Sequence, residues 1–203
     1  MLHTTGPTIR ATSRKKDRTS VSFIPDWVRF GLQGAPSVLE TLLRRRALDI
    51  AGTSPASLSV YFNGEKVPVK HFGHYAKQIL PDAVHIRLGD RWEIAVAAKT
   101  DEAPVVPTFV NGICTHRGGS HVKHVCEPLF KYIADVASKR VRGLKIRPKH
   151  VENFAHVFVN CLVVNPAFDS QTKETLTSTV KDFGSRAQWT PELLKKCTRQ
   201  TNI

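Results

Sequence analysis

The chain has 203 residues, 41% of them hydrophobic, so it is long enough to bury the core of one large domain. Its formal net charge of +13 and its pI near 9.9 favour a polyanionic partner or an anionic ligand. No apolar run reaches the roughly 18 residues that a membrane span needs, and the four cysteines lack zinc-ligand spacing, so the sequence argues against a membrane protein and a structural zinc site.

The N-terminal part combines a polar start with one strand-like and one helix-like pattern. Residues 1–19 are basic and poor in acid, which predicts a surface or terminal segment and leaves a transit-peptide interpretation open. Apolar and polar residues alternate over Ser20–Asp26, which predicts a short half-buried strand. Leucines at helical spacing predict a helix over Val38–Gly52, with Gly52 marking its end and the arginines Arg44–Arg46 on its outer, solvated face.

Beyond a small polar link at Thr53–Ser57, the pattern changes to short strands. Asn63-Gly64 lies between two alternating runs and predicts a β-hairpin, because a type I′ turn needs positive φ at both central positions. Three further elements are predicted next: a short helix, a strand, and a strand that runs into a glycine pair (Phe72–Leu80, Trp92–Ala98 and Pro107–His121).

A long amphipathic helix is predicted over Ser120–Lys139, with a kink at Pro128 because proline removes one helical hydrogen bond. The helix leads into a cation-rich run, Lys139–Lys149. From the residues alone, this run is equally compatible with contact to a phosphate backbone and with a solvated helix end. A short helical turn at Pro148–Glu152 is predicted to follow.

The last part of the chain is predicted to contain a buried strand, a polar loop and a helix. The strand covers Phe154–Val164, and the helix starts at Thr190 with a threonine cap and a proline at its first position. The loop, Asn165–Gly184, carries Lys173 between polar neighbours. A lysine on a loop braced by a strand can reach a phosphate, although a solvated loop lysine is the simpler interpretation. All four cysteines fall in predicted strands or helices, as expected of reduced, buried thiols.

Three segments, in this order, resemble the transducer domain of eukaryotic-type DNA topoisomerase II, the domain that follows the ATP-binding domain in that family. They are FNGEKVPVKHF (Phe62–Phe72), TFVNGICTHRGGSHV (Thr108–Val122) and VFVNCLVVNPAFDSQTKETLTSTVKDFGS (Val157–Ser185). Upstream, TSVSFIPDWVRF and RRRALDIAG resemble the last strand and the exit helix of the ATP-binding domain. The resemblance covers about Ser20 to Cys197, and bacterial gyrase-type enzymes share its Gln-Thr-Lys element, which indicates a type IIA topoisomerase.

This resemblance implies an α+β fold in two parts. Residues 56–203 would form the transducer, a ribosomal protein S5 domain 2-like fold with a mixed sheet of about four strands backed by helices. Residues 1–55 would be the C-terminal end of the ATP-binding domain.

The resemblance also implies two sets of functional residues. In the family, the Gln-Thr-Lys loop reaches the nucleotide pocket and its lysine contacts the γ-phosphate of ATP. Here these residues are Gln171, Thr172 and Lys173, with Lys173 as the catalytic residue, since a lysine there stabilises charge on the transferred phosphoryl group. A basic loop at the end of the family's long transducer helix faces DNA, which implies DNA contacts by Lys139, Arg140 and Arg142.

By the same resemblance, the full-length enzyme would be a nuclear homodimer, with an organellar location left open, that uses ATP and Mg²⁺ to act on double-stranded DNA. The family's ATP-pocket motifs and its DNA-cleaving tyrosine do not occur in this sequence. We therefore expect an internal segment that is inactive alone and contains no Mg²⁺ ligands. The alternative is a free-standing basic nucleic-acid-binding module of the same fold without enzymatic activity; such a binder has no need of the string FDSQTK.

Overall fold

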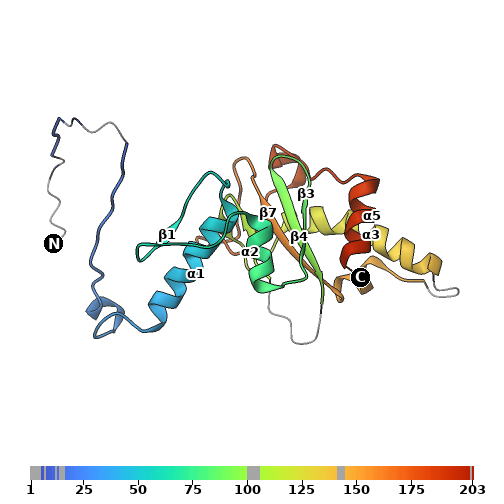
Figure 1. The fold of residues 1–203 in the computed structure, drawn as a ribbon, viewed down its shortest axis with the longest axis horizontal. Coiled ribbons are helices and arrows are strands. Elements are labelled where there is room, and N and C mark those ends of the chain that lie inside the picture. Colours follow the sequence, from blue (N-terminus) through green and yellow to red (C-terminus); the bar gives the residue numbers. More distant parts are fainter. Residues whose placement is uncertain are drawn as a thin grey trace. The chain divides into compact units, whose positions relative to one another are not determined.

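The computed structural model describes residues 6, 8–11, 13, 17–99, 106–140, 145–201 and 203. The chain divides into two compact units, Met1–Leu39 and Glu40–Ile203 (Figure 1). The second unit thus includes most of the predicted N-terminal helix. The assignment of residues 1–55 and 56–203 to two different domains stays a prediction.

The first unit contains a short 3-10 helix, η1 (Val28–Phe30), and the strand predicted over Ser20–Asp26 is wrong. Val21, Phe23 and Ile24 are exposed, and none of the described residues pairs with their backbone. Alternation alone does not make a strand, because the backbone groups of an extended segment need a partner.

Helix α1 runs from Val38 to Thr53, close to the predicted range, but Gly52 lies inside it rather than after it. A Cβ at Gly52 would lie 2.6 Å from Cβ of Tyr75, which belongs to the next helix. The glycine therefore permits close packing between two helices, and the end of α1 falls one residue later.

The predicted hairpin and the short helix after it are confirmed. Strands β1 (Tyr61–Phe62) and β2 (Glu65–Lys66) pair antiparallel, and Asn63 and Gly64 have φ values of 50° and 83°. Helix α2 (Phe72–Ile79) follows. Nδ1 of His71, the N-cap residue, accepts a hydrogen bond of 3.2 Å from the backbone N–H of His74.

Among the described residues, the main sheet has five strands in the order β3-β4-β7-β5-β6, and of its neighbouring pairs only β5–β7 is parallel. The predicted strand Trp92–Ala98 is confirmed, whereas the predicted strand Pro107–His121 is in fact a hairpin that turns at Asn111 and Gly112, with φ values of 52° and 74°. The strands are β3 (Val84–Arg87), β4 (Trp92–Ala98), β5 (Thr108–Val110), β6 (Ile113–Cys114) and β7 (Ala155–Cys161). The sequence had not predicted β3.

Helices cover both faces of this sheet (Figure 1). Alternate residues of β4 divide between two cores: Ile94 faces the core of α3 (Ser120–Arg140) and α5 (Pro191–Thr201), while Ala95 faces the core shared with α1 and α2. The long helix is confirmed and continues through Pro128. The short α4 (Pro148–Glu152) and η2 (Val180–Phe183) complete the unit.

The predicted cap of α5 is confirmed, and the predicted buried thiols are confirmed for Cys126, Cys161 and Cys197, whereas Cys114 is half-buried. Thr190 Oγ1 accepts a 3.3 Å hydrogen bond from the backbone N–H of Leu193. All four cysteines are free, and burial raises the pKa of Cys126 and Cys197 to about 12. Within the described ranges, no helix has the length and apolar character of a membrane span.

Candidate functional site

Lys173 lies on an exposed turn in the loop after β7, and the side chains of Gln171 and Thr172 beside it are also exposed. Its backbone N–H donates a 3.1 Å hydrogen bond to the carbonyl of Ser170, which closes the turn. Lys173 itself has φ of 59°, in the left-handed region that residues other than glycine rarely adopt. The three residues named by the Gln-Thr-Lys resemblance therefore form the tip of one tight turn.

The neck of this loop is held by Asp169 and Thr175. The N–H of Asp169 donates to the carbonyl of Thr175 over 3.2 Å, and the N–H of Thr175 donates to Asp169 Oδ1 over 3.1 Å. Burial works to raise the pKa of Asp169, but hydrogen bonds from Thr175 and Ser170 outweigh it and hold that pKa below its usual value. The turn with Lys173 is thus closed by a pair of reciprocal bonds.

The loop is also bound to the beginning of α3. The N–H of Leu176 donates to the carbonyl of Gly118 over 3.1 Å, and the N–H of Ser120 donates to the carbonyl of Leu176 over 3.0 Å. Gly119 lies between these bonds, and a Cβ there would come within 2.4 Å of the Leu176 carbonyl oxygen. Only glycine permits so close an approach, so Gly119 fixes the loop against α3.

Both acidic side chains next to the turn have partners other than Lys173. The Glu174 carboxylate lies 3.0 Å from Nε of Arg117 and 3.5 Å from Nε2 of His116, and Asp169 accepts the bonds described above. Among the described residues, no carboxylate forms an ion pair with Lys173. Its Nζ instead lies 5.7 Å from the centroid of the Phe168 ring, within the range of a cation–π interaction.

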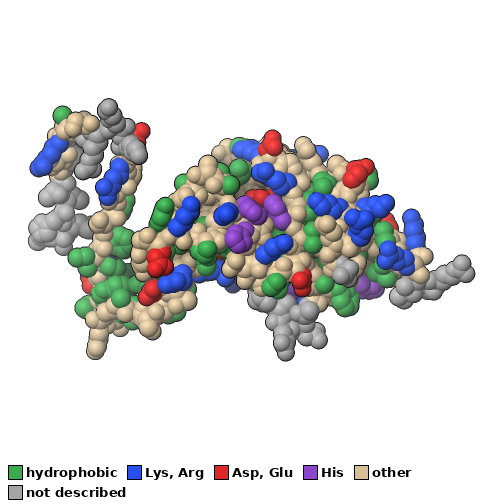
Figure 2. Space-filling view, in the orientation of Figure 1, with side chains coloured by type: hydrophobic (Ala, Val, Ile, Leu, Met, Phe, Trp, Pro, Cys, Tyr) green, Lys and Arg blue, Asp and Glu red, His purple; other side chains and the backbone are tan. Residues whose placement is uncertain are grey.

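The predicted DNA-contacting cations lie at the other end of α3. Lys139 and Arg140 form its last turn and are exposed, whereas Arg142 falls outside the described residues. Since α3 has 21 residues, each rising about 1.5 Å, roughly 30 Å of helix separates them from the Lys173 loop. The structure therefore separates the two predicted sites. Figure 2 shows that Lys and Arg side chains are spread over the visible face of the second unit.

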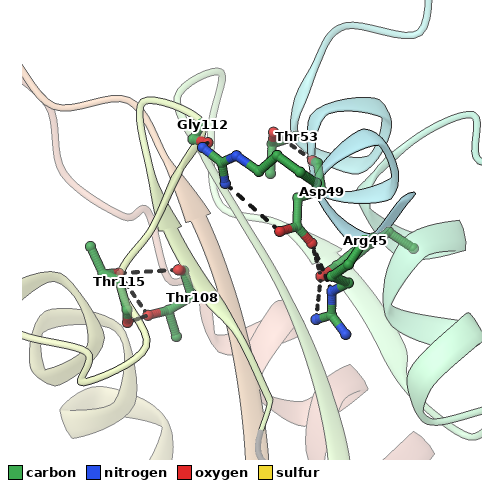
Figure 3. A network of polar contacts seen from close by, with 8 residues as sticks. Arg45, Asp49, Thr53, Thr108, Gly112 and Thr115 are labelled. Atoms are coloured by element: carbon green, nitrogen blue, oxygen red, sulfur yellow. Dashed lines mark hydrogen bonds and ion pairs between the residues drawn. The ribbon is translucent and has the colours of Figure 1, made fainter. Parts of the chain in front are cut away.

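A polar network joins α1 to α2 and to the β5–β6 turn (Figure 3), and the sequence did not predict it. Asp49 is buried and accepts hydrogen bonds from Arg45 Nε at 3.0 Å and from the Tyr75 hydroxyl at 2.7 Å. Arg46 lies 3.7 Å from the other Asp49 oxygen, and Arg46 Nη2 donates to the Gly112 carbonyl over 3.4 Å. Arg45 and Arg46 are exposed, as predicted, but each also forms an ion pair with the buried Asp49, which was not predicted. The i, i+3 and i, i+4 spacing to Asp49 was the available signal.

A second network joins the β5–β6 hairpin to the start of α3. Thr108 Oγ1 donates to the carbonyl of Thr115 over 2.7 Å, and the Thr115 hydroxyl lies 3.2 Å from Nε2 of His121 (Figure 3 shows the threonine pair). Burial lowers the pKa of His121 to about 4, so its imidazole is neutral at pH 7. This network supports the segment on which the Lys173 loop is bound.

The chain is similar in sequence to known proteins. A family model described as DNA gyrase B matches residues 55–201. The chain is 38% identical to the probable DNA topoisomerase 2 of Dictyostelium discoideum over 197 residues, which cover 94% of this chain and 13% of that protein. It is 35% identical to the DNA topoisomerase 2 of Arabidopsis thaliana over 201 residues, which cover 94% of this chain and 14% of that protein. The chain thus spans a small part of these relatives.

Solved structures similar to this chain come from the same kind of enzyme as the sequence relatives. The ATPase region of Saccharomyces cerevisiae topoisomerase II matches with a TM-score of 0.75 and 35% identity, over 86% of this chain and 45% of that one. The ATPase and transducer domains of DNA topoisomerase II from Balamuthia mandrillaris match with a TM-score of 0.74 and 38% identity, over 80% of this chain and 41% of that one. The B subunit of DNA gyrase from Myxococcus xanthus, at 22% identity and a TM-score of 0.51, shares the fold.

These similarities give no support to the alternative of a free-standing nucleic-acid-binding module. They agree with the α+β class and the mixed sheet. Because the family model covers most of the chain, the chain belongs to the DNA gyrase B family of type II DNA topoisomerases.

Proposed function

We propose that this chain is the transducer segment of an ATP-dependent type II DNA topoisomerase and that Lys173 senses the γ-phosphate of ATP. In this proposal, residues 56–203 form the transducer with the ribosomal protein S5 domain 2-like fold, and residues 1–55 end the ATP-binding domain. The similar structures from yeast and Balamuthia support it, because the first is an ATPase region and the second consists of ATPase and transducer domains.

The proposal rests on one observation: the Lys173 ammonium group is exposed and forms no ion pair with a carboxylate among the described residues. The turn that presents it is closed at its neck by Asp169 and Thr175 and bound to α3 through Leu176. The nearby acids are engaged with other groups, so the exposed ammonium is available to an anion from outside this chain. A preorganised cation of this kind stabilises negative charge without reorganisation of the protein.

The described residues fit a contact with the end of a nucleotide rather than a complete nucleotide site. Bound ATP would supply the γ-phosphate anion, and Lys173 would donate hydrogen bonds to it, with Gln171 and Thr172 on the same turn. The proposed Mg²⁺ belongs to the full-length enzyme. Within the described ranges, no group of three or more His, Cys, Asp or Glu side chains is suited to hold a metal ion, and we assign Mg²⁺ no step here.

The remaining parts of the proposal concern the full-length enzyme. It would be a homodimer that acts on double-stranded DNA in the nucleus, with an organelle as the other location. Lys139, Arg140 and Arg142 would contact the phosphate backbone from the end of α3. Lys139 and Arg140 are exposed and are separated from the Lys173 loop along α3, which suits a second binding surface, whereas Arg142 lies outside the described residues.

Steady-state ATP hydrolysis by a full-length enzyme containing this segment tests the role of Lys173. We expect Lys173→Ala to lower turnover roughly 10²-fold, since one preorganised donor to the developing charge is lost. Lys181→Ala is the matched control, because Lys181 is exposed in η2, outside the turn. Near-normal turnover in Lys173→Ala would show that Lys173 takes no part in ATP hydrolysis.

A further inference from the structure

Arg117 and Glu174 are joined through both their backbones and their side chains. The N–H of Arg117 donates to the carbonyl of Glu174 over 3.1 Å, and Arg117 Nε lies 3.0 Å from a Glu174 carboxylate oxygen. The Glu174 side chain is 24% exposed, whereas that of Arg117 is 68% exposed. The carboxylate is thus drawn toward the segment before α3, although Glu174 follows Lys173 directly in the chain.

We propose that Arg117 is a positioning residue for Lys173: its guanidinium group holds the Glu174 carboxylate away from the ammonium, which stays available to a phosphate. This inference rests on the proposed function of Lys173. It assigns Arg117 an electrostatic role in anion binding that is separate from holding the loop in place.

The charges around the turn identify Glu174 as the acidic residue that would compete with a phosphate for the Lys173 ammonium. Asp169 Oδ1 already accepts hydrogen bonds from the N–H of Thr175 and the hydroxyl of Ser170, and these bonds belong to the neck of the loop. Glu174 is held by Arg117, with His116 at 3.5 Å. A Glu174 carboxylate without Arg117 would be one residue away from Lys173, and opposite charges near a protein surface attract over several ångströms. It would compete with a phosphate for the same ammonium.

The docking of the loop does not depend on the Arg117 side chain. Backbone hydrogen bonds join Leu176 to Gly118 and to Ser120, and the buried Leu176 side chain packs in the core. An ion pair as exposed as that of Arg117 contributes little to stability. Neutralising Arg117 should therefore change the charge around Lys173 while the loop stays bound to α3.

The test is the affinity of the full-length enzyme for a non-hydrolysable ATP analogue in three variants: Arg117→Gln, Glu174→Gln and the double variant. We expect Arg117→Gln to weaken binding about two- to fivefold, the range for an exposed charge pair. Glu174→Gln alone should bind at least as tightly as the parent enzyme. The double variant should bind like Glu174→Gln, because the competing carboxylate is absent.

Two measurements, hydrogen exchange and nucleotide affinity, can contradict the role proposed for Arg117. In this chain, hydrogen exchange of the Leu176 amide should be the same with Arg117→Gln as without it, whereas faster exchange would show that Arg117 only fixes the loop. A double variant as weak as Arg117→Gln, or an Arg117→Gln variant with unchanged affinity, would overturn the proposed role. Lys173→Ala is measured in parallel: if it weakens binding while Arg117→Gln does not, this inference fails and the function proposed for Lys173 stands.

Discussion

His121, at the start of α3, couples the stability of the fold to pH. Its side chain is buried, and its Nδ1 has no hydrogen-bond partner among the described residues. Burial lowers its pKa to about 4, whereas a histidine in an unfolded chain titrates near 6.5. Between these values the unfolded chain binds a proton that the folded chain does not. Stability is therefore lost as the pH falls from about 6.5 to about 4.

Replacing His121 by glutamine should remove this part of the pH dependence. Gln keeps a polar group for Thr115 but does not titrate. The free energy of unfolding, measured with denaturant at pH 7 and pH 4.5, should fall by about 2 kcal/mol less in His121→Gln than in the parent chain. Part of the loss should remain, because His71, His124 and His156 also have pKa values lowered mainly by burial. Equal losses in the two proteins would contradict the assignment.

Among single residues, the sequence named Lys173 as a candidate site residue but did not predict the contacts that hold its loop. A polar loop after a buried strand was evident from composition, and the resemblance named Lys173. The left-handed φ of Lys173 and the pairing of Glu174 with Arg117 left no local signal, because the partners are far apart in the sequence. The Asp49 ion pairs were not predicted either, although the i, i+3 and i, i+4 spacing to Arg46 and Arg45 is a local signal for them.

Among the elements, the contact between the Lys173 loop and α3 depends on one glycine. Gly119→Ala would place a Cβ within 2.4 Å of the Leu176 carbonyl, and its φ of 137° is also unfavourable for alanine. We expect a loss of about 3 kcal/mol in the free energy of unfolding, as for other cases of overpacking, together with faster hydrogen exchange of the Leu176 amide.

Gly118→Ala is the matched control for this prediction. Gly118 also has positive φ, 71°, but its nearest neighbour, Val122 Cγ2, would lie 3.4 Å from the new Cβ, an ordinary contact. This variant should lose only the about 1–2 kcal/mol of a left-handed alanine and keep the loop bound. Equal effects of the two substitutions would mean that backbone strain, and not the contact with Leu176, explains Gly119.

The elements that the sequence predicted well are those with strong local signals. The helices α3, α4 and α5, the strand β4 and the β1–β2 hairpin follow from periodicity, capping or Asn-Gly turns. The β5–β6 hairpin has the same Asn-Gly signal, at Asn111-Gly112, but its short flanking strands resembled one continuous strand. Strand β3 is short and half polar, and it depends on pairing with β4, which no local pattern displays.

At the scale of the whole molecule, the net charge of +13 suits a polyanion, and the end of α3 is where we place its contact. Changing Lys139, Arg140 and Arg142 to glutamine should flatten the log–log salt dependence of DNA binding by about one unit per lost phosphate contact. Lys66, Lys70 and Lys77, all exposed, provide a control that removes the same charge elsewhere. An equal change of slope in the control would indicate diffuse attraction rather than contact at α3.

The proposed contact between Lys173 and the γ-phosphate can be tested by comparing the binding of two nucleotides. In the full-length enzyme, Lys173→Ala should weaken binding of a non-hydrolysable ATP analogue about 10-fold or more, the value of a charge-assisted hydrogen bond. Binding of ADP, which has no γ-phosphate, should be unchanged. Equal weakening for both nucleotides, or none for either, would contradict a contact between Lys173 and the γ-phosphate.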